Sequence, residues 1–201
     1  MHIFVDESGQ FNSSEQSKFA VMTIVTLSDR AHDNFCNFYS STFGAEGARA
    51  KSTDIDFSTR EKIIKYVKKY PEIRYAAFVY DHHSTSEDAI AMHQIRQVKK
   101  IELGIERIRL TAKHQSLIKD LELLRNQLRK LSLPDYLKVI LLVEILREWS
   151  ITFAFDYFYM DAKRDDWIMR HVFDMQNNPP TFIRLVYSLL AFSSNVLVPN
   201  V

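Results

Sequence analysis

The first nine residues constrain the fold of this chain more than any other stretch. Residues 3–5 (IFV) form an apolar run of β-branched and aromatic side chains, which is typical of a short buried strand. The run ends on the carboxylates of Asp6 and Glu7, and residues 8–9 (SG) then predict a turn. We therefore predict a strand that delivers two carboxylates to its end, beside a turn that leaves them open to a ligand.

Asp6 has two interpretations that the residues alone leave open. A rigid strand can hold its carboxylate as a metal ligand, since Mg²⁺ prefers carboxylate oxygens. The side chain can instead cap the turn by accepting a hydrogen bond from the backbone two residues further on. The first interpretation predicts a functional role for Asp6, and the second a structural one.

Composition sets ordinary bounds for a chain of 201 residues, and we expect a single domain over residues 1–201. Hydrophobic residues make up 46% and charged residues 25%, so the chain can fill a sizeable core. A net charge of +1 gives no global field toward nucleic acid. The single cysteine, Cys36, excludes an internal disulfide, and no apolar run is long enough to span a bilayer. These features predict a cytoplasmic protein with no membrane partner.

Strand and helix signals alternate along most of the chain. The patterns predict strands at 19–27, 73–80 and 151–155. They also predict one helix capped by Ser28, a second capped by Ser58, and two more at 136–149 and 164–175. Residues 182–190 fit a last strand, with a helix as the open alternative. The strand at 151–155 ends on Asp156, as the first strand ends on Asp6. The order predicts a mixed α/β sheet in which two strands end in carboxylates.

Residues 87–131 are helical in pattern almost throughout, with apolar residues three and four apart, and we interpret them as a helical insertion. Between Arg96 and Lys130 there are ten Lys or Arg and four Asp or Glu. This excess is consistent with a basic arm that contacts a phosphate backbone. It is equally consistent with a solvated helical face that carries pairs such as Glu106–Arg109.

Two carboxylates at neighbouring strand ends suit a divalent-metal site. Close carboxylates raise one another's pKa, and a bound cation relieves that repulsion. Two Mg²⁺ or Mn²⁺ ions about 3.5–4 Å apart activate a water and stabilise the leaving oxygen of a phosphodiester. The chemistry that this pattern predicts is metal-dependent hydrolysis.

The opening IFVDESG, followed by a polar loop and the strand at 19–27, resembles the start of the domain-of-unknown-function 3800 family. Three further features support the resemblance, namely Lys51-Ser52 before a helix, the strand ending at Asp156, and the stretch from Ser193 to Asn200. The resemblance covers most of the chain except about residues 87–131.

The resemblance implies a ribonuclease-H-like α/β fold, with a mixed sheet flanked by helices, and a divalent-metal-dependent nuclease activity on DNA or RNA with Mg²⁺ or Mn²⁺. Asp6 would be the bridging metal ligand and Asp156 the second. Glu7 and Asp161 would be accessory groups, with Asp161 near the metal, and Lys51 would contact phosphate. Nucleic acid would be the partner.

Two departures from the family pattern favour an alternative function. Arg49 stands where members often carry a Glu, and the chain stops at Val201, before the place of the family's C-terminal Ala-Asp pair. The alternative is a catalytically impaired nucleic-acid-binding or protein-assembly module that uses the helical insertion. With either function, we expect residues 87–131 to pair as a helical hairpin or to dock against another copy of the chain in a homo-oligomer. A serine hydrolase built on Ser8 has no partner His in a recognisable motif.

Overall fold

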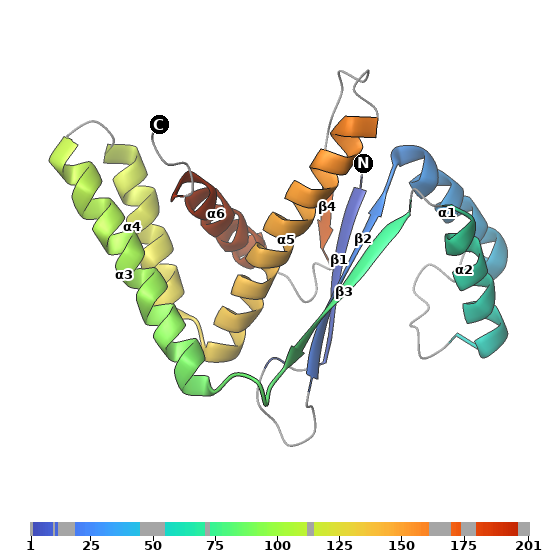
Figure 1. The fold of residues 1–201 in the computed structure, drawn as a ribbon, viewed down its shortest axis with the longest axis horizontal. Helices are drawn as coiled ribbons and strands as arrows, with labels where there is room; N and C mark the ends of the chain where they lie inside the picture. Colours follow the sequence, from blue (N-terminus) through green and yellow to red (C-terminus); the bar gives the residue numbers. More distant parts are fainter. Residues whose placement is uncertain are drawn as a thin grey trace. The chain divides into compact units, whose positions relative to one another are not determined.

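The structure is a computed structural model of the chain. It describes residues 2–9, 11, 19–44, 55–70, 73–111, 115–160, 170–173 and 180–196. At 111, 150–160, 170–173, 180 and 192–196 it describes the backbone only. Helices dominate the described residues (Figure 1).

One sheet contains the four strands β1 (His2–Gly9), β2 (Phe19–Leu27), β3 (Arg74–Asp81) and β4 (Arg170–Phe173), in the order β3-β2-β1-β4. β2 runs antiparallel to its neighbours β1 and β3 (Figure 1). β4 has only four residues and pairs with β1 in parallel, with His2 opposite Arg170. The predicted strand at 19–27 is confirmed, and the strand predicted at 73–80 is shifted by one residue.

The ribonuclease-H-like mixed sheet predicted from the sequence is wrong. Residues 151–155 belong to helix α5 (Leu133–Met160), and residues 182–190 belong to helix α6 (Pro180–Val196). Part of the predicted helix at 164–175 is instead β4. What remains is a small sheet of three antiparallel strands with a short fourth strand, in a chain built mainly of helices.

The continuation of α5 through residues 151–155 has a local cause. A short apolar run has no periodicity that separates a buried strand from a buried helix. No Gly or Pro stands between Trp149 and Met160 to end the helix, and extending an existing helix costs far less than nucleating one. Only Ile151 and Thr152 in this run are β-branched, so the local preference for a strand is weak.

The chain divides into two compact units. Unit 1 comprises residues 1–6, 23–77 and 164–174, and unit 2 comprises residues 7–22, 78–163 and 175–201. In unit 1, helices α1 (Asp29–Phe43) and α2 (Phe57–Lys69) accompany the sheet residues. Its core is formed by Leu27, Ala31 and Ile73, with partly buried Phe4, Val25, Tyr66, Val67 and Tyr70 packed against them.

Side-chain caps start both helices of unit 1. Ser28 Oγ accepts a hydrogen bond from the backbone N–H of Ala31 at 3.1 Å, which confirms the predicted cap of α1. α2 is capped by Asp56 rather than by Ser58 as predicted, because Asp56 Oδ1 accepts a hydrogen bond from the N–H of Thr59 at 2.7 Å. Hydrogen bonds from the Thr59 amide and hydroxyl lower the pKa of Asp56, since they stabilise its charged form.

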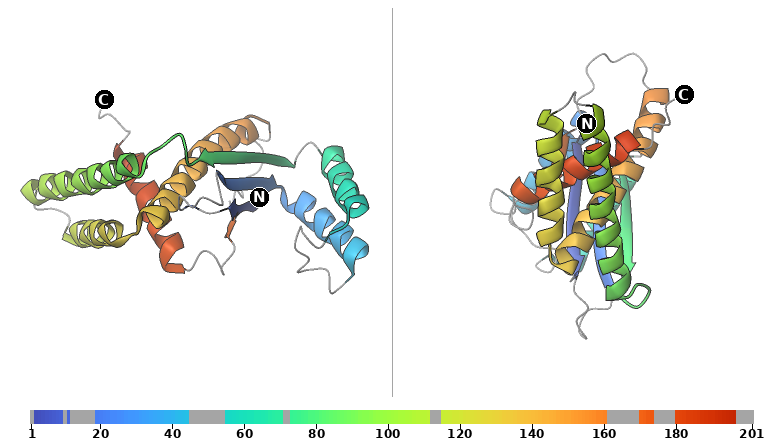
Figure 2. Two further views of the ribbon diagram at one scale, coloured as in Figure 1. Left: turned by 90° about the horizontal axis from the view of Figure 1, so that it is seen from below. Right: turned by 90° about the vertical axis from the view of Figure 1, so that its left-hand side faces the viewer.

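Unit 2 contains α3 (Glu87–Thr111), α4 (Gln115–Lys130), α5 and α6. α3 packs along α4 and also contacts α5, while α6 packs on α5 and α4 (Figure 2). The predicted pairing of the insertion as a hairpin is therefore observed in α3 and α4. No helix among the described residues is long and apolar enough to cross a membrane. The most deeply buried side chains of this unit include Ile101, Ile105, Leu128, Tyr136, Val139, Leu142 and Leu146.

Polar contacts fix the α3–α4 hairpin to the start of α5. Gln94 Nε2 donates to the carbonyl oxygens of Leu128 at 2.7 Å and Leu131 at 3.2 Å, and so satisfies acceptors at the end of α4. His93 Nδ1 lies 2.7 Å from the hydroxyl oxygen of the buried Tyr136. Burial raises the pKa of Tyr136, so this phenol stays protonated at every ordinary pH.

The His93 contact predicts a pH-dependent stability. Partial burial lowers the pKa of His93 from its ordinary value of 6.5, and the charge of Lys100 lowers it further, while Glu144 and Arg96 have smaller and opposite effects. The unfolded chain then binds more protons than the folded chain just below pH 6.5, so the free energy of unfolding should fall as the pH falls through this range. Urea unfolding at pH 8 and pH 5.5 measures this change. The free energy of unfolding of His93→Gln should fall less between pH 8 and pH 5.5 than that of the wild type. If it falls equally in the two proteins, other groups cause the pH dependence.

Candidate functional site

The two carboxylates of the opening segment lie within β1 rather than after it. β1 continues through Asp6 and Glu7 to Gly9, where the backbone φ is +85°. A Cβ atom at Gly9 would lie 2.6 Å from the carbonyl oxygen of Phe19, so only glycine fits both the conformation and the close approach to β2. The strand therefore includes residues 8–9, and the prediction that it ends at Asp6 and Glu7 before a turn at these residues is wrong.

Strand alternation places the two carboxylates on opposite faces of β1. Ile3 and Val5 are buried, and Glu7 follows them on the same face, whereas Asp6 is exposed. Two adjacent residues of a regular strand cannot direct their side chains to one ion. The geometry therefore separates Asp6 from Glu7.

Glu7 forms an ion pair with Lys138 of α5. Its Oε1 accepts a hydrogen bond from Lys138 Nζ, and each of the two side chains is only 13% exposed. Lys138 Nζ also lies 5.0 Å from the centre of the Phe182 ring, within reach of a cation–π interaction. A carboxylate neutralised by a lysine in this way is poorly suited to bind a metal cation, and we interpret Glu7 as structural.

The remaining predicted site residues are not brought together by the described part of the chain. Asp156 lies within α5 instead of at a strand end, and only its backbone is described. Lys51 and Asp161 lie outside the described residues. Among the described residues, no group of three or more His, Cys, Asp or Glu side chains is placed to hold a metal ion. The metal site therefore stays a prediction.

Melting curves with and without Mn²⁺ test the metal prediction. If Asp6 holds an ion, Mn²⁺ should raise the melting temperature of the wild-type chain, because the ion binds only the folded state. Asp6→Asn should lose that rise and any Mn²⁺-dependent cleavage of DNA or RNA. If Asp6 holds no ion, Mn²⁺ should have no effect, and because Asp6 is exposed within β1 its replacement should change the stability by no more than about 0.5 kcal/mol.

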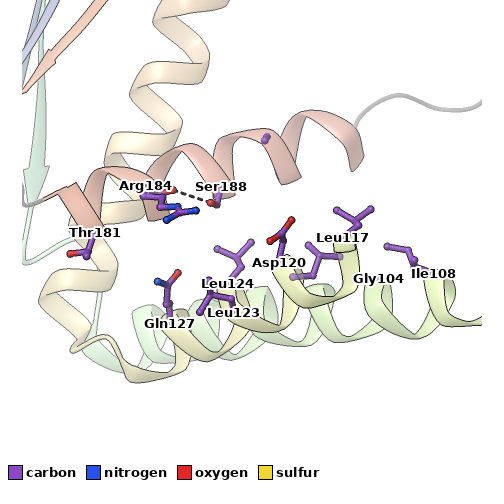
Figure 3. Close-up of a pocket in the computed structure, with 12 residues that line it drawn as sticks. Gly104, Ile108, Leu117, Asp120, Leu123, Leu124, Gln127, Thr181, Arg184 and Ser188 are labelled. Carbon is purple, nitrogen blue, oxygen red and sulfur yellow. Dashed lines mark hydrogen bonds between the residues drawn. The ribbon is translucent and has the colours of Figure 1, made fainter. Parts of the chain in front are cut away.

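A groove runs between α4 and α6 (Figure 3). It has a volume of about 520 Å³ and an apolar lining from α4 that includes Leu117, Leu121 and Leu124. Asp120 and Arg184 stand on opposite sides of it (Figure 3), and neither has an ion-pair partner in the described part of the chain. The groove combines apolar and charged surface but holds no arrangement typical of catalysis. The sequence did not indicate this groove, because residues 182–190 were expected to form a last strand, with a helix as the open alternative.

The second notable surface of unit 2 is the side of α3 that faces away from its buried residues. Val98, Ile101 and Ile105 are buried, and at 100° per residue the opposite side of the helix carries a second set of apolar residues. Their exposed fractions are 49% for Met92, 59% for Ile95, 47% for Leu103 and 87% for Leu110. We call this surface, together with Lys99 and Glu106 between them, the α3 outer face.

Ion pairs tie α3 to α4 but leave the α3 outer face unpaired. Arg109 donates to Glu122 at 2.5 Å, and Arg129 donates to Glu102. The pairing of Arg109 with Glu106 that the sequence suggested is replaced by this contact with α4. Within the described residues, Lys99 and Glu106 have no ion-pair partner. The α3 outer face thus carries four apolar side chains, one cation and one anion.

A scan of protein-family models, a search of curated proteins and a search of solved structures each found no match to this chain. The resemblance to the domain-of-unknown-function 3800 family therefore rests on the sequence features quoted above and stays a prediction. The functional assignment must come from the described surfaces themselves.

Proposed function

We propose that unit 2 is a protein-assembly module through which two copies of this chain associate by their α3 outer faces. The single observation that carries this proposal is the exposure of Met92, Ile95, Leu103 and Leu110 on one side of α3. Single exposed apolar residues are normal, but four on one side of the same helix, with Lys99 and Glu106 between them, favour an interaction surface. The proposal corresponds to the assembly alternative weighed from the sequence.

The charges on the surface favour a second copy as the occupant. Lys99 and Glu106 lie on the α3 outer face without ion-pair partners among the described residues. A surface that carries one cation and one anion can satisfy both by meeting itself, as the self-complementary contacts of symmetric dimers do. A strongly acidic or basic partner would satisfy only one of them. The single cysteine, Cys36, fits such an assembly in the reducing cytoplasm.

Sedimentation velocity over a concentration series tests the proposal. The wild-type chain should shift from monomer to dimer as its concentration rises. Leu110→Lys places a charge on the most exposed member of the stripe, and each dimer contains the change twice, so association should weaken by about 100-fold. The matched control is Leu123→Lys, because Leu123 is 53% exposed but lies on α4. A wild-type chain that stays monomeric, or a Leu110→Lys variant that associates like the wild type, would refute the proposal.

A further inference from the structure

We infer that the two α3 helices pair antiparallel about a two-fold axis beside Leu103. This inference rests on the proposed self-association and specifies its geometry. It follows from the order of residues along the α3 outer face. Leu103 and Leu110 are seven residues apart, as are Lys99 and Glu106, and a seven-residue repeat keeps a stripe directed at a neighbouring helix.

The stripe is complementary to itself when it is reversed. Lys99 and Glu106 lie equally far from the point midway between Glu102 and Leu103, and Ile95 and Leu110 lie equally far from that same point. A two-fold axis through this point therefore brings Lys99 opposite Glu106 of the second copy. It also brings Ile95 opposite Leu110 of the second copy. Symmetry makes each of these contacts twice.

A parallel pair of α3 helices is unfavourable because of the same residues. A parallel, in-register pair places Lys99 opposite Lys99 and Glu106 opposite Glu106. Like charges that face one another across an interface are unfavourable. The antiparallel arrangement replaces two repulsive contacts with two attractive ones, and it keeps Ile95 opposite Leu110.

The arrangement also limits the strength of the dimer. From Ile95 to Leu110 the stripe is about 22 Å long at roughly 1.5 Å per residue, or about four helical turns. One helix pair of this length buries less surface than the roughly 1,600 Å² of a standard interface. Arg96 and Arg107 of the two copies also approach along one solvent-exposed edge, where salt screens their repulsion. We therefore expect a concentration-dependent dimer rather than an obligate one.

Charge reversal tests the pairing of Lys99 with Glu106. Lys99→Glu alone and Glu106→Lys alone should each weaken dimerisation by about tenfold, because two attractive contacts become repulsive. The double variant Lys99→Glu/Glu106→Lys restores opposite charges at both contacts and should dimerise like the wild type. A double variant that dimerises as weakly as the single variants would overturn the antiparallel pairing. The proposed self-association would still stand in that case if Leu110→Lys weakened dimerisation as expected.

Disulfide trapping in a Cys36→Ser background tests the orientation directly. Ile95→Cys and Leu110→Cys are prepared as separate proteins, mixed and oxidised, and the linked peptides are identified by mass spectrometry. A disulfide needs Cα atoms within about 7 Å, so the antiparallel register predicts a link between positions 95 and 110 and none between identical positions. Links between identical positions would overturn the antiparallel register. Absence of any link in a mixture that still dimerises would overturn pairing through α3, and absence of dimers in the wild type would refute the proposed function itself.

Discussion

Lys138→Met should lower the free energy of unfolding of unit 2 by about 3 kcal/mol or more, the range measured when one partner of a buried ion pair is removed. The substitution keeps most of the side-chain volume but leaves the Glu7 carboxylate, only 13% exposed, without its cation. It also removes the cation over the Phe182 ring. Urea unfolding followed by the helical circular dichroism signal measures this loss.

Two further variants separate the ion pair from other effects of the substitution. The double variant Glu7→Gln/Lys138→Met removes the charge that Lys138→Met leaves on Glu7 and should recover much of the loss. Lys65→Met breaks an exposed pair, Lys65–Glu61 at 3.4 Å on α2, and should change the stability by less than about 1 kcal/mol. If Lys138→Met were as mild as Lys65→Met, the interpretation of Glu7 as a structural residue would be wrong.

Leu128→Ala should lower the free energy of unfolding by about 2–5 kcal/mol. Leu128 is fully buried on the inner side of α4. Truncating a leucine at such a position removes its contacts and leaves a cavity that rigid helices close only in part. Denaturant unfolding at constant pH measures the change.

Leu123→Ala on the same helix is the matched comparison. Leu123 is half exposed, so its truncation should change the stability by no more than about 0.5 kcal/mol. Equal losses of stability in the two variants would mean that α4 does not pack against the other helices of unit 2 through the side that carries Leu128. Because α3 packs on α4, such a result would also call into question which side of α3 is buried and whether the α3 outer face is exposed.

Strong local signals predicted much of the secondary structure. The second strand has nine residues that are nearly all apolar, and Ser28 offers a side-chain cap immediately before an amphipathic segment. The helical periodicity of residues 87–131 correctly predicted helical structure there, and the pairing of α3 with α4 follows from the need to bury Ile101, Ile105 and Leu128. In each case the residues that determine the element lie close together in the sequence.

The fold class could not be predicted because it depends on choices that local sequence leaves open. The apolar run at 151–155 fits a strand or a buried helix equally well, and the helix that precedes it decided the outcome. The same holds for residues 182–190, which form part of α6. With both segments helical, the sheet lost the strand that was expected to carry Asp156.

The candidate site depended on contacts across long sequence separations. Glu7 was predicted to be an accessory group of a metal site, and nothing near it in sequence indicates its partner Lys138, 131 residues away. Glu7 and Asp6 point to opposite faces of the sheet because both lie within β1, which continues to Gly9. The α3 outer face could not be predicted for another reason, because the apolar residues of 87–131 were interpreted as a single stripe on the helices. The structure divides it into a buried side with Val98 and an exposed side with Ile95.

The most direct test of self-association through α3 is a dilution series followed by NMR of methionine methyl groups. Met92 lies on the α3 outer face, whereas Met22 is buried in the sheet. A dimer formed through α3 predicts that the Met92 methyl signal moves with concentration while the Met22 signal stays fixed, and that Leu110→Lys abolishes the movement. A Met92 signal that stays fixed across a concentration range in which the chain becomes dimeric would contradict the proposed interface.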